Sequence, residues 1–261
     1  MKNVSSYQLL GLRVDAMTLS DLQAVAAEAI EGSRRCLIAN HNLHSTYLYH
    51  HDARMREFYA KARYVQIDGM PLILLGKLWG YPLGAEHRLG AVDWVPRLTA
   101  EAARRGWRVF HLGSKPGVAE RGAEILTNRF PGLQMATAHG YFDADPDSDE
   151  NREVLELIND YRPNVLVVGM GMPRQEHWIL DNLDRIEADV ILHAGAYMDF
   201  VAGVASTPPR WMGPLFLEWL YRLYNEPRRL WRRYLLEPWF VLALVLKELF
   251  ERRVHRGEKS G

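Results

Sequence analysis

Residues 164–178 read Asn-Val-Leu-Val-Val-Gly-Met-Gly-Met-Pro-Arg-Gln-Glu-His-Trp, and this stretch carries the main information about the fold. A short apolar run rich in valine is typical of a strand that is buried on both faces. The two glycines that follow it allow the backbone to approach closely. Pro173 suits the first turn of a helix. The stretch therefore predicts a strand, a turn and a helix, which is one unit of a parallel α/β sheet.

The same alternation of short apolar runs and helix-period segments extends from Arg35 to about Gly203 and predicts an α/β fold with crossover helices. The predicted strands are Arg35–Asn40, Tyr64–Asp68, Trp107–Leu112, Gln134–Ala138, Asn164–Met170 and Asp189–Ala194. Helix starts are predicted at Ser20, which would form a capping box with Gln23, and at Asp149. In such sheets, ligands bind at the carboxyl ends of the strands.

The composition changes after Gly203, and we predict a core at residues 1–203 and a helical appendage at 204–261. Residues 208–256 carry ten Lys or Arg against five Glu, while the whole chain has 32 basic and 32 acidic residues. This basic and aromatic end favours a surface for anionic lipid or phosphate, and a packed hairpin with a solvated basic face is the alternative. Arg222, Arg229 and Arg232 share a face if helical order holds across Pro227.

Several protein classes are disfavoured by composition. A net charge of zero gives no argument for nucleic-acid binding. Cys36 is the only cysteine, which excludes an intramolecular disulfide and fits the cytosol. The amino-terminal residues do not resemble a signal peptide. The longest apolar segment, Pro238–Phe250, is too short and too charged to cross a membrane, although it could lie on one.

Polar side chains follow the first two predicted strands. Asn40, His41 and Asn42 end the first strand, and their side chains could bind sugar hydroxyls or a diphosphate, or an asparagine could cap the next helix. Asp68 follows the second strand and precedes Gly69. Its carboxylate could deprotonate an attacking hydroxyl, or it could cap the following helix.

Other candidate groups lie further along the chain. Arg88 could pair with donor phosphates or form a surface ion pair. Gln175 falls in the first turn of the helix after the glycines, where it could bind a hydroxyl. The nearest Asp-x-Asp pair, Asp143 and Asp145, lies in an acidic loop and not at a strand end. We therefore expect a mechanism without a metal ion or other cofactor.

Taken in order, these segments resemble the WecG/TagA/CpsF glycosyltransferases, glycosyltransferase family 26, from about Leu12 to Tyr234. The motifs that carry the resemblance are Asp68-Gly69, Gly90-Ala-Val-Asp93, Val109-Phe-His-Leu-Gly113, Lys115-Pro-Gly-Val-Ala-Glu120, Gly140-Tyr-Phe142, Gly169-Met-Gly171-Met-Pro-Arg-Gln175-Glu176, Met198-Asp199-Phe200, Pro209-Arg-Trp211 and Glu218-Trp219-Leu-Tyr-Arg222.

The resemblance implies a Rossmann-like core, a UDP-sugar donor, inversion at the anomeric carbon and an acceptor linked to polyprenyl diphosphate, in bacterial polysaccharide synthesis. It also implies an appendage that engages the cytoplasmic face of the cell membrane and helps to complete the active site. By position it assigns Asp68 as the base, Asn40 and Gln175 as sugar contacts, Arg88 as a donor-site cation, Asp199 to the nucleotide pocket, and Arg222, Arg229 and Arg232 to the diphosphate.

The chain departs from the family pattern at Ile38, where many members have threonine. This loss of a hydroxyl weakens any transfer of donor identity, and N-acetylmannosamine, its uronic acid and glucose all stay compatible with the resemblance. A non-catalytic nucleotide-binding regulator and a scaffold of a polysaccharide assembly machine are the alternative functions. A homo-oligomer is possible, because the sequence does not distinguish an oligomer surface from a surface that faces lipid.

Overall fold

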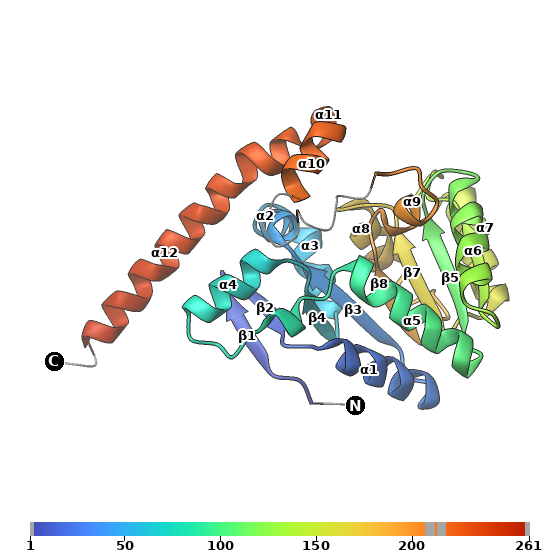
Figure 1. Cartoon of the computed structure of the whole chain (residues 1–261), viewed down its shortest axis with the longest axis horizontal. Helices are drawn as coiled ribbons and strands as arrows, with labels where there is room; N and C mark the ends of the chain where they lie inside the picture. The colour runs from blue at the N-terminus through green and yellow to red at the C-terminus, as the bar shows by residue number, and fades with distance from the viewer. Residues whose placement is uncertain (1–2, 207–211, 213–217, 259–261) are drawn as a thin grey trace.

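The computed structural model describes residues 3–206, 212 and 218–258 of the chain. Its main sheet has six parallel strands in the order β4-β3-β8-β7-β5-β6 (Figure 1). These strands are β3 (Cys36–His41), β4 (Tyr64–Ile67), β5 (Arg108–Gly113), β6 (Gln134–Ala138), β7 (Val165–Gly169) and β8 (Val190–His193). The predicted Rossmann-like α/β class is confirmed, and each predicted strand agrees with an observed one to within one residue at either end.

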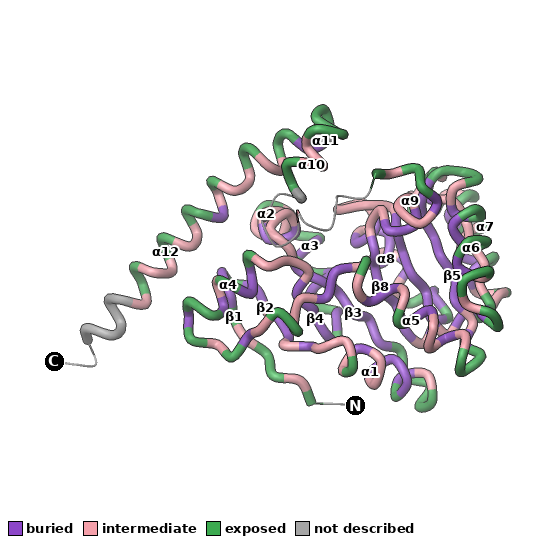
Figure 2. The backbone as a smooth tube through the Cα atoms, viewed as in Figure 1, coloured by how far each residue is buried: buried purple, intermediate pink, exposed green. Residues whose placement is uncertain are grey.

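Helices cover both faces of this sheet, because alternate strand residues point to opposite sides. In β7, Val165 and Val167 belong to one core cluster, whereas Leu166 and Val168 belong to the other. The first cluster lies under α1 (Leu19–Glu31), α5 (Ala91–Arg105) and α6 (Val118–Arg129), and the second under α3 (Ala53–Lys61), α7 (Asp149–Tyr161) and α8 (Arg174–Asn182). Figure 2 shows the strands as the most buried part of the chain.

A short antiparallel hairpin, β1 (Ser6–Leu9) and β2 (Leu12–Asp15), was not predicted. Its four-residue strands are too short for a clear alternation of apolar and polar residues. Asp15 ties the hairpin to the main sheet, because its Oδ2 accepts a hydrogen bond from the Val65 backbone at 2.6 Å. The hairpin packs with α4 (Met70–Leu78) in a third apolar cluster beside β4.

Two predicted helix starts are wrong by one or two residues. The N-cap of α1 is Thr18, which forms a capping box with Asp21, and not Ser20 with Gln23. The N-cap of α7 is Ser148, whose hydroxyl accepts from the backbone of Asn151, and not Asp149. In both cases a hydroxyl residue one or two positions earlier satisfies the first free backbone N–H groups equally well.

The carboxyl-terminal region is helical where the structure describes it. After β8 come α9 (Tyr197–Val201), α10 (Glu218–Asn225), α11 (Pro227–Trp231), a π-helical turn η3 (Arg232–Leu236) and α12 (Glu237–Glu258). Pro227 opens α11, so that α10 and α11 are separate helices. The predicted boundary at Gly203 stays a prediction.

Helix α12 packs along α2 (Leu43–His51) and then extends beyond the sheet (Figure 1). Its start is held by His44 Nδ1, which lies 2.7 Å from Glu237 Oε2. Further along, Glu248 Oε2 accepts a hydrogen bond from the Leu10 backbone at 2.9 Å, and Val241 joins the third apolar cluster. No helix in the described part of the chain is long and apolar enough to span a membrane.

Candidate active site

Four adjacent strands lead into polar side chains at the carboxyl edge of the sheet. In the order β4, β3, β8 and β7, these side chains are Asp68 after β4, Asn40 in β3, His193 in β8 and the pair Gln175–Glu176 in the first turn after β7. Because parallel strands end at the same edge, four segments that are distant in sequence meet there. Figure 1 shows α2, α10 and α11 at this end of the molecule.

Asp68 is half-buried between the end of β3 and the loop that contains Gly90. Its Oδ2 lies 3.5 Å from Asn42 Nδ2, and a Cβ atom added to Gly90 would lie 3.0 Å from its Oδ1. The N-cap of α4 is Gly69, and no side chain of the described residues caps that helix. Asp68 is therefore not used as a helix cap, whereas Asn42 does cap α2 and accepts from the Ser45 backbone.

The surroundings of Asp68 shift its pKa into the range of a useful base. Burial raises the pKa of this carboxyl to about 6, and the hydrogen bond from Asn42 and the positive charges of Arg222, Arg233 and Arg88 act in the opposite direction. Asp68 is therefore mostly ionised at neutral pH, yet its basicity is higher than that of an ordinary aspartate. A base is most effective when its pKa is close to the working pH.

Arginines from two parts of the chain lie near Asp68. Arg88 forms an ion pair with Asp93, with 3.0 Å between Nη2 and Oδ2. Arg222 comes from α10, and its guanidinium lies 5.4 Å from the centre of the Phe200 ring. Its Nε is buried and has no hydrogen-bond partner among the residues that the structure describes. Arg233 comes from η3, where burial and the like charge of Arg222 lower its pKa. Half-buried guanidiniums in this state favour an anion between them.

The other predicted appendage residues are placed differently. Arg232 is exposed, and its guanidinium lies 5.4 Å from the Trp231 ring centre. The side chain of Arg229 lies outside the described part of the structure. Asp199 is half-buried on α9 after β8. The sequence pattern did not point to Arg233, because it assumed a regular helix. The break at Pro227 and the π-helical turn change the direction in which each side chain leaves the helix.

The structure brings Asn40 and Gln175 together around His193. The Asn40 backbone N–H donates to His193 Nε2 at 3.1 Å, and Asn40 Nδ2 donates to the His193 carbonyl at 3.3 Å. Gln175 Nε2 donates to Glu176 Oε1 at 2.8 Å, and this oxygen lies 3.2 Å from His193 Nδ1. His193, Gln175 and Glu176 are at most 1% exposed. No role was predicted for His193. Glu176 was expected to bind a sugar or nucleotide hydroxyl together with Gln175, but it is fully buried against His193.

Burial changes the proton affinity of this cluster in two directions. It raises the pKa of Glu176 to about 7 and lowers the pKa of His193 to about 3. His193 is therefore neutral at pH 7, while Glu176 is close to the midpoint of its titration. Burial has opposite effects because in each case it disfavours the charged form of the group.

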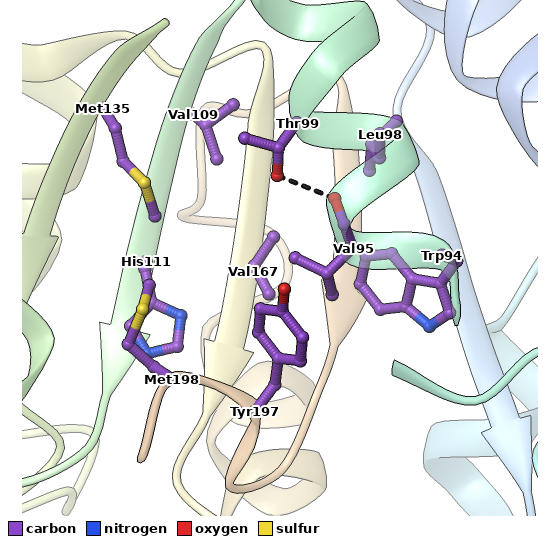
Figure 3. Close-up of a pocket in the computed structure, with 10 residues that line it drawn as sticks. All are labelled: Trp94, Val95, Leu98, Thr99, Val109, His111, Met135, Val167, Tyr197 and Met198. Atoms are coloured by element: carbon purple, nitrogen blue, oxygen red, sulfur yellow. Dashed lines mark hydrogen bonds between the residues drawn. The ribbon is translucent and has the colours of Figure 1, made fainter. Parts of the chain in front are cut away.

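An internal cavity of about 10 Å³ lies on the α5 side of the sheet (Figure 3). Its lining residues are Trp94, Val95, Leu98, Thr99, Val109, His111, Met135, Val167, Tyr197 and Met198. The lining is almost wholly apolar, and the Thr99 hydroxyl donates to the Val95 carbonyl at 2.7 Å. A space of this size holds about one water molecule, so it is not a substrate site.

The acidic loop after β6 uses its carboxylates within the loop. Asp143 Oδ1 accepts from the Asp145 backbone at 3.1 Å, and Asp145 Oδ1 accepts from the Asp147 backbone at 3.0 Å. Within residues 3–206, 212 and 218–258, no group of three or more His, Cys, Asp or Glu side chains could hold a metal ion.

The sheet, the carboxylate at its edge and the arginines beside it are typical of an enzyme that transfers a group with an anionic leaving group. Residues 7–255 match the model of the glycosyl transferase WecG/TagA/CpsF family, and the chain belongs to this family. Among curated proteins, it is similar to the N-acetylglucosaminyldiphosphoundecaprenol N-acetyl-beta-D-mannosaminyltransferases of Staphylococcus aureus strains MW2 and NCTC 8325 / PS 47. Each is 28% identical over 176 residues, which cover 67% of this chain and 66% of the relative.

Proposed function

We propose that this chain transfers a sugar from a UDP-sugar to an acceptor linked to polyprenyl diphosphate, with inversion, in the synthesis of a bacterial exopolysaccharide or cell-surface polysaccharide. Family membership supports glycosyl transfer, and the names of the relatives support a lipid diphosphate acceptor. The observation that carries the proposal is Asp68, a carboxyl with a pKa of about 6 on which the positive charge of Arg222 acts. The Nε of Arg222 is buried and has no hydrogen-bond partner within the described part of the chain.

In the proposed reaction, Asp68 takes the proton of the acceptor hydroxyl as its oxygen attacks the anomeric carbon of the donor. The bond from that carbon to the diphosphate of UDP breaks, and the electron pair stays with the leaving oxygen. Arg222 and Arg233 stabilise the negative charge that develops there, and Arg88 adds a third cation. These fixed cations are proposed to act in place of a metal ion.

The other residues that the family resemblance points to bind the substrates in this proposal. Asn40 and Gln175 orient the donor sugar, Asp199 contributes to the nucleotide pocket, and Arg229 and Arg232 bind phosphate of the acceptor near the surface. Ile38 is fully buried in the core, so its position offers no side-chain hydrogen bond to the donor. N-acetylmannosamine is the first donor to test because the relatives are named for its transfer.

We also propose that α12 attaches the enzyme peripherally to the cytoplasmic face of the cell membrane. One side of the region η3–α12 packs on the core, whereas another carries exposed apolar side chains at intervals of three or four residues. These are Leu235, Trp239, Leu242, Leu246 and Phe250, which are 45–70% exposed. Such a stripe next to basic residues suits an interface with anionic lipid.

To test the proposal, the wild-type chain and Asp68→Asn are each incubated with membranes that contain lipid-linked acceptors and with a panel of labelled UDP-sugars. Label in the lipid fraction is then measured. We expect label from one donor to enter the lipid fraction, and we expect Asp68→Asn to lower the rate by roughly 10²–10⁴-fold, as for loss of a general base.

Asp181→Asn is the matched control, because Asp181 lies on α8 and pairs with Arg54 away from the site. A folded Asp68→Asn protein with the wild-type rate would remove Asp68 from the role of base. Binding of UDP without transfer from any donor would favour the regulator over the enzyme.

A further inference from the structure

We infer that Glu176 is a positioning residue: its carboxylate holds His193 and Gln175 in one orientation and, through His193, fixes Asn40 at the catalytic edge. The expected effect of Glu176 on the rate rests on the proposed function, whereas its effect on His193 does not. Glu176 is fully buried and therefore acts through its neighbours.

The hydrogen bonds of His193 show which of its ring nitrogens carries the proton. The Asn40 backbone N–H lies 3.1 Å from His193 Nε2, and a backbone amide can only donate. His193 Nε2 must therefore be the acceptor and carry no proton. Because burial keeps the ring neutral at pH 7, its single proton is on Nδ1.

Glu176 provides the acceptor for the hydrogen bond from His193 Nδ1. Glu176 Oε1 lies 3.2 Å from His193 Nδ1, and it also accepts a hydrogen bond from Gln175 Nε2 at 2.8 Å. His193 Nδ1 also lies 3.0 Å from Gln175 Nε2 and 3.4 Å from Asn40 Nδ2. Amide nitrogens only donate, so Glu176 Oε1 is the acceptor among these contacts of Nδ1. Glu176 thus selects the Nδ1–H tautomer of His193.

Glu176 and His193 are connected to the catalytic edge. The Gln175 side chain is held at its other end too, because Oε1 accepts from the Gly171 backbone at 3.1 Å. The Asn40 carbonyl accepts from Tyr59 Oη at 2.8 Å. Asn40 lies two residues before Asn42, whose side chain contacts Asp68. The network therefore links the turn after β7 to the base across three neighbouring strands, β7, β8 and β3.

In the part of the chain that the structure describes, few charged and titratable groups lie around Glu176. His193 and Tyr59 face it from β8 and α3, and Arg233 acts on it from η3. The second carboxylate oxygen, Oε2, is buried and has no hydrogen-bond partner among the described residues. A buried carboxyl with one unsatisfied oxygen costs stability, and such a cost is typical of a functional site.

The test compares Glu176→Met, which keeps the shape but removes the acceptor, with Glu176→Gln, which keeps an acceptor oxygen but removes the charge. We expect Glu176→Met to lower kcat/KM by about 10- to 100-fold, the range for residues that orient functional histidines. Glu176→Gln should recover much of this loss. Asp181→Asn on the same helix is the control for removal of a carboxylate and should leave the rate unchanged.

A spectroscopic readout separates positioning from general stability. Nitrogen NMR of protein labelled in its ten histidines, with His193 assigned from a His193→Gln variant, reports which ring nitrogen carries the proton. We expect the Nδ1–H form in the wild type and a changed tautomer or a shifted Nδ1 signal in both Glu176 variants. This readout needs no substrate, and Glu176→Gln provides it even if Glu176→Met does not fold.

The inference is overturned if the His193 signals are the same in wild type and Glu176→Gln, or if a folded Glu176→Met protein has the wild-type kcat/KM. Failure of the proposed function would be a different result. In that case the wild-type chain would transfer no sugar, and the NMR comparison would still decide whether Glu176 holds His193.

Discussion

Asp68 and Glu176 are two carboxyls at one edge of one sheet, and burial raises the pKa of both. Their partners differ. Asp68 is half-buried and accepts one long hydrogen bond from Asn42. The positive charges of nearby arginines favour its ionised form and so limit the rise in its pKa. Glu176 is fully buried, and its direct side-chain contacts in the described structure are the neutral donors of Gln175 and His193, while the charge of Arg233 is only the weakest influence on its pKa.

The difference indicates two uses of the same chemical group. A carboxylate that is partly accessible and flanked by cations can exchange a proton with a ligand beside those cations. A carboxylate enclosed by neutral donors fixes the orientation of the side chains that donate to it. The partners, and not the size of the pKa shift, therefore distinguish a base from a positioning group.

Loss of the arginine charges beside Asp68 should have the largest effect on the rate. Arg233→Met and Arg222→Met should each lower kcat by about 10²–10³-fold, because each removes a fixed positive charge from the leaving group. Arg232→Met, at the exposed neighbouring position, should change kcat much less. Steady-state kinetics of the three variants checks the order. Equal losses for Arg232 and Arg233 would contradict the inward placement of Arg233.

The next effect is the pH dependence of the rate. Asp68 must be ionised to act as a base, so kcat/KM should fall about tenfold for each pH unit below about 6. Arg233→Met should move this limb to higher pH, because loss of a nearby positive charge raises the pKa of Asp68. Initial rates of UDP release from pH 4 to 8 measure the limb. A limb that stays in place in Arg233→Met would show that Arg233 does not act on Asp68.

Replacement of either carboxyl by its amide should have a smaller effect on stability. The variants should lose activity but gain stability. Both carboxyls have a higher pKa in the folded than in the unfolded chain, so stability falls as pH rises from about 4 to about 7. Ionisation of each buried carboxyl lowers the free energy of unfolding by at most about 3 kcal/mol at pH 8, and Asp68→Asn or Glu176→Gln removes this penalty. We expect Tm to rise by several degrees at pH 8 and hardly at all at pH 4. Thermal unfolding at both pH values provides the test, and a lower Tm at pH 8 would contradict it.

The smallest predicted effect concerns α12. Replacement of Trp239 and Leu246 by Gln should weaken binding to anionic liposomes by roughly tenfold, since each removes exposed apolar area that lipid would cover. Leu157→Gln is the control because Leu157 is 51% exposed on α7. Sedimentation with liposomes measures the change. Unaltered binding of the α12 variant would favour an oligomer surface instead.

The sheet and its polar carboxyl edge could be predicted from the sequence because their signals are local. Each parallel strand is a short apolar run, and Asp68 and Asn40 stand where such runs end. The hairpin of β1 and β2 could not be predicted, since four residues do not define a periodic pattern. The roles of Glu176 and Arg233 were also out of reach, because their partners are remote in the sequence.

Local sequence patterns specify the α/β class, the strands and the residues at their carboxyl ends, because hydrophobic periodicity and turn residues act over a few positions. Which of these residues meet depends on how the strands and helices pack. The contact of Asn40 with His193 spans 153 residues and exists because β8 inserts between β3 and β7. Arg233 is near Asp68 because a proline break and a π-helical turn set the phase of the last helices. Strand order and helix phase are consequences of packing over the whole chain, so no local pattern encodes them.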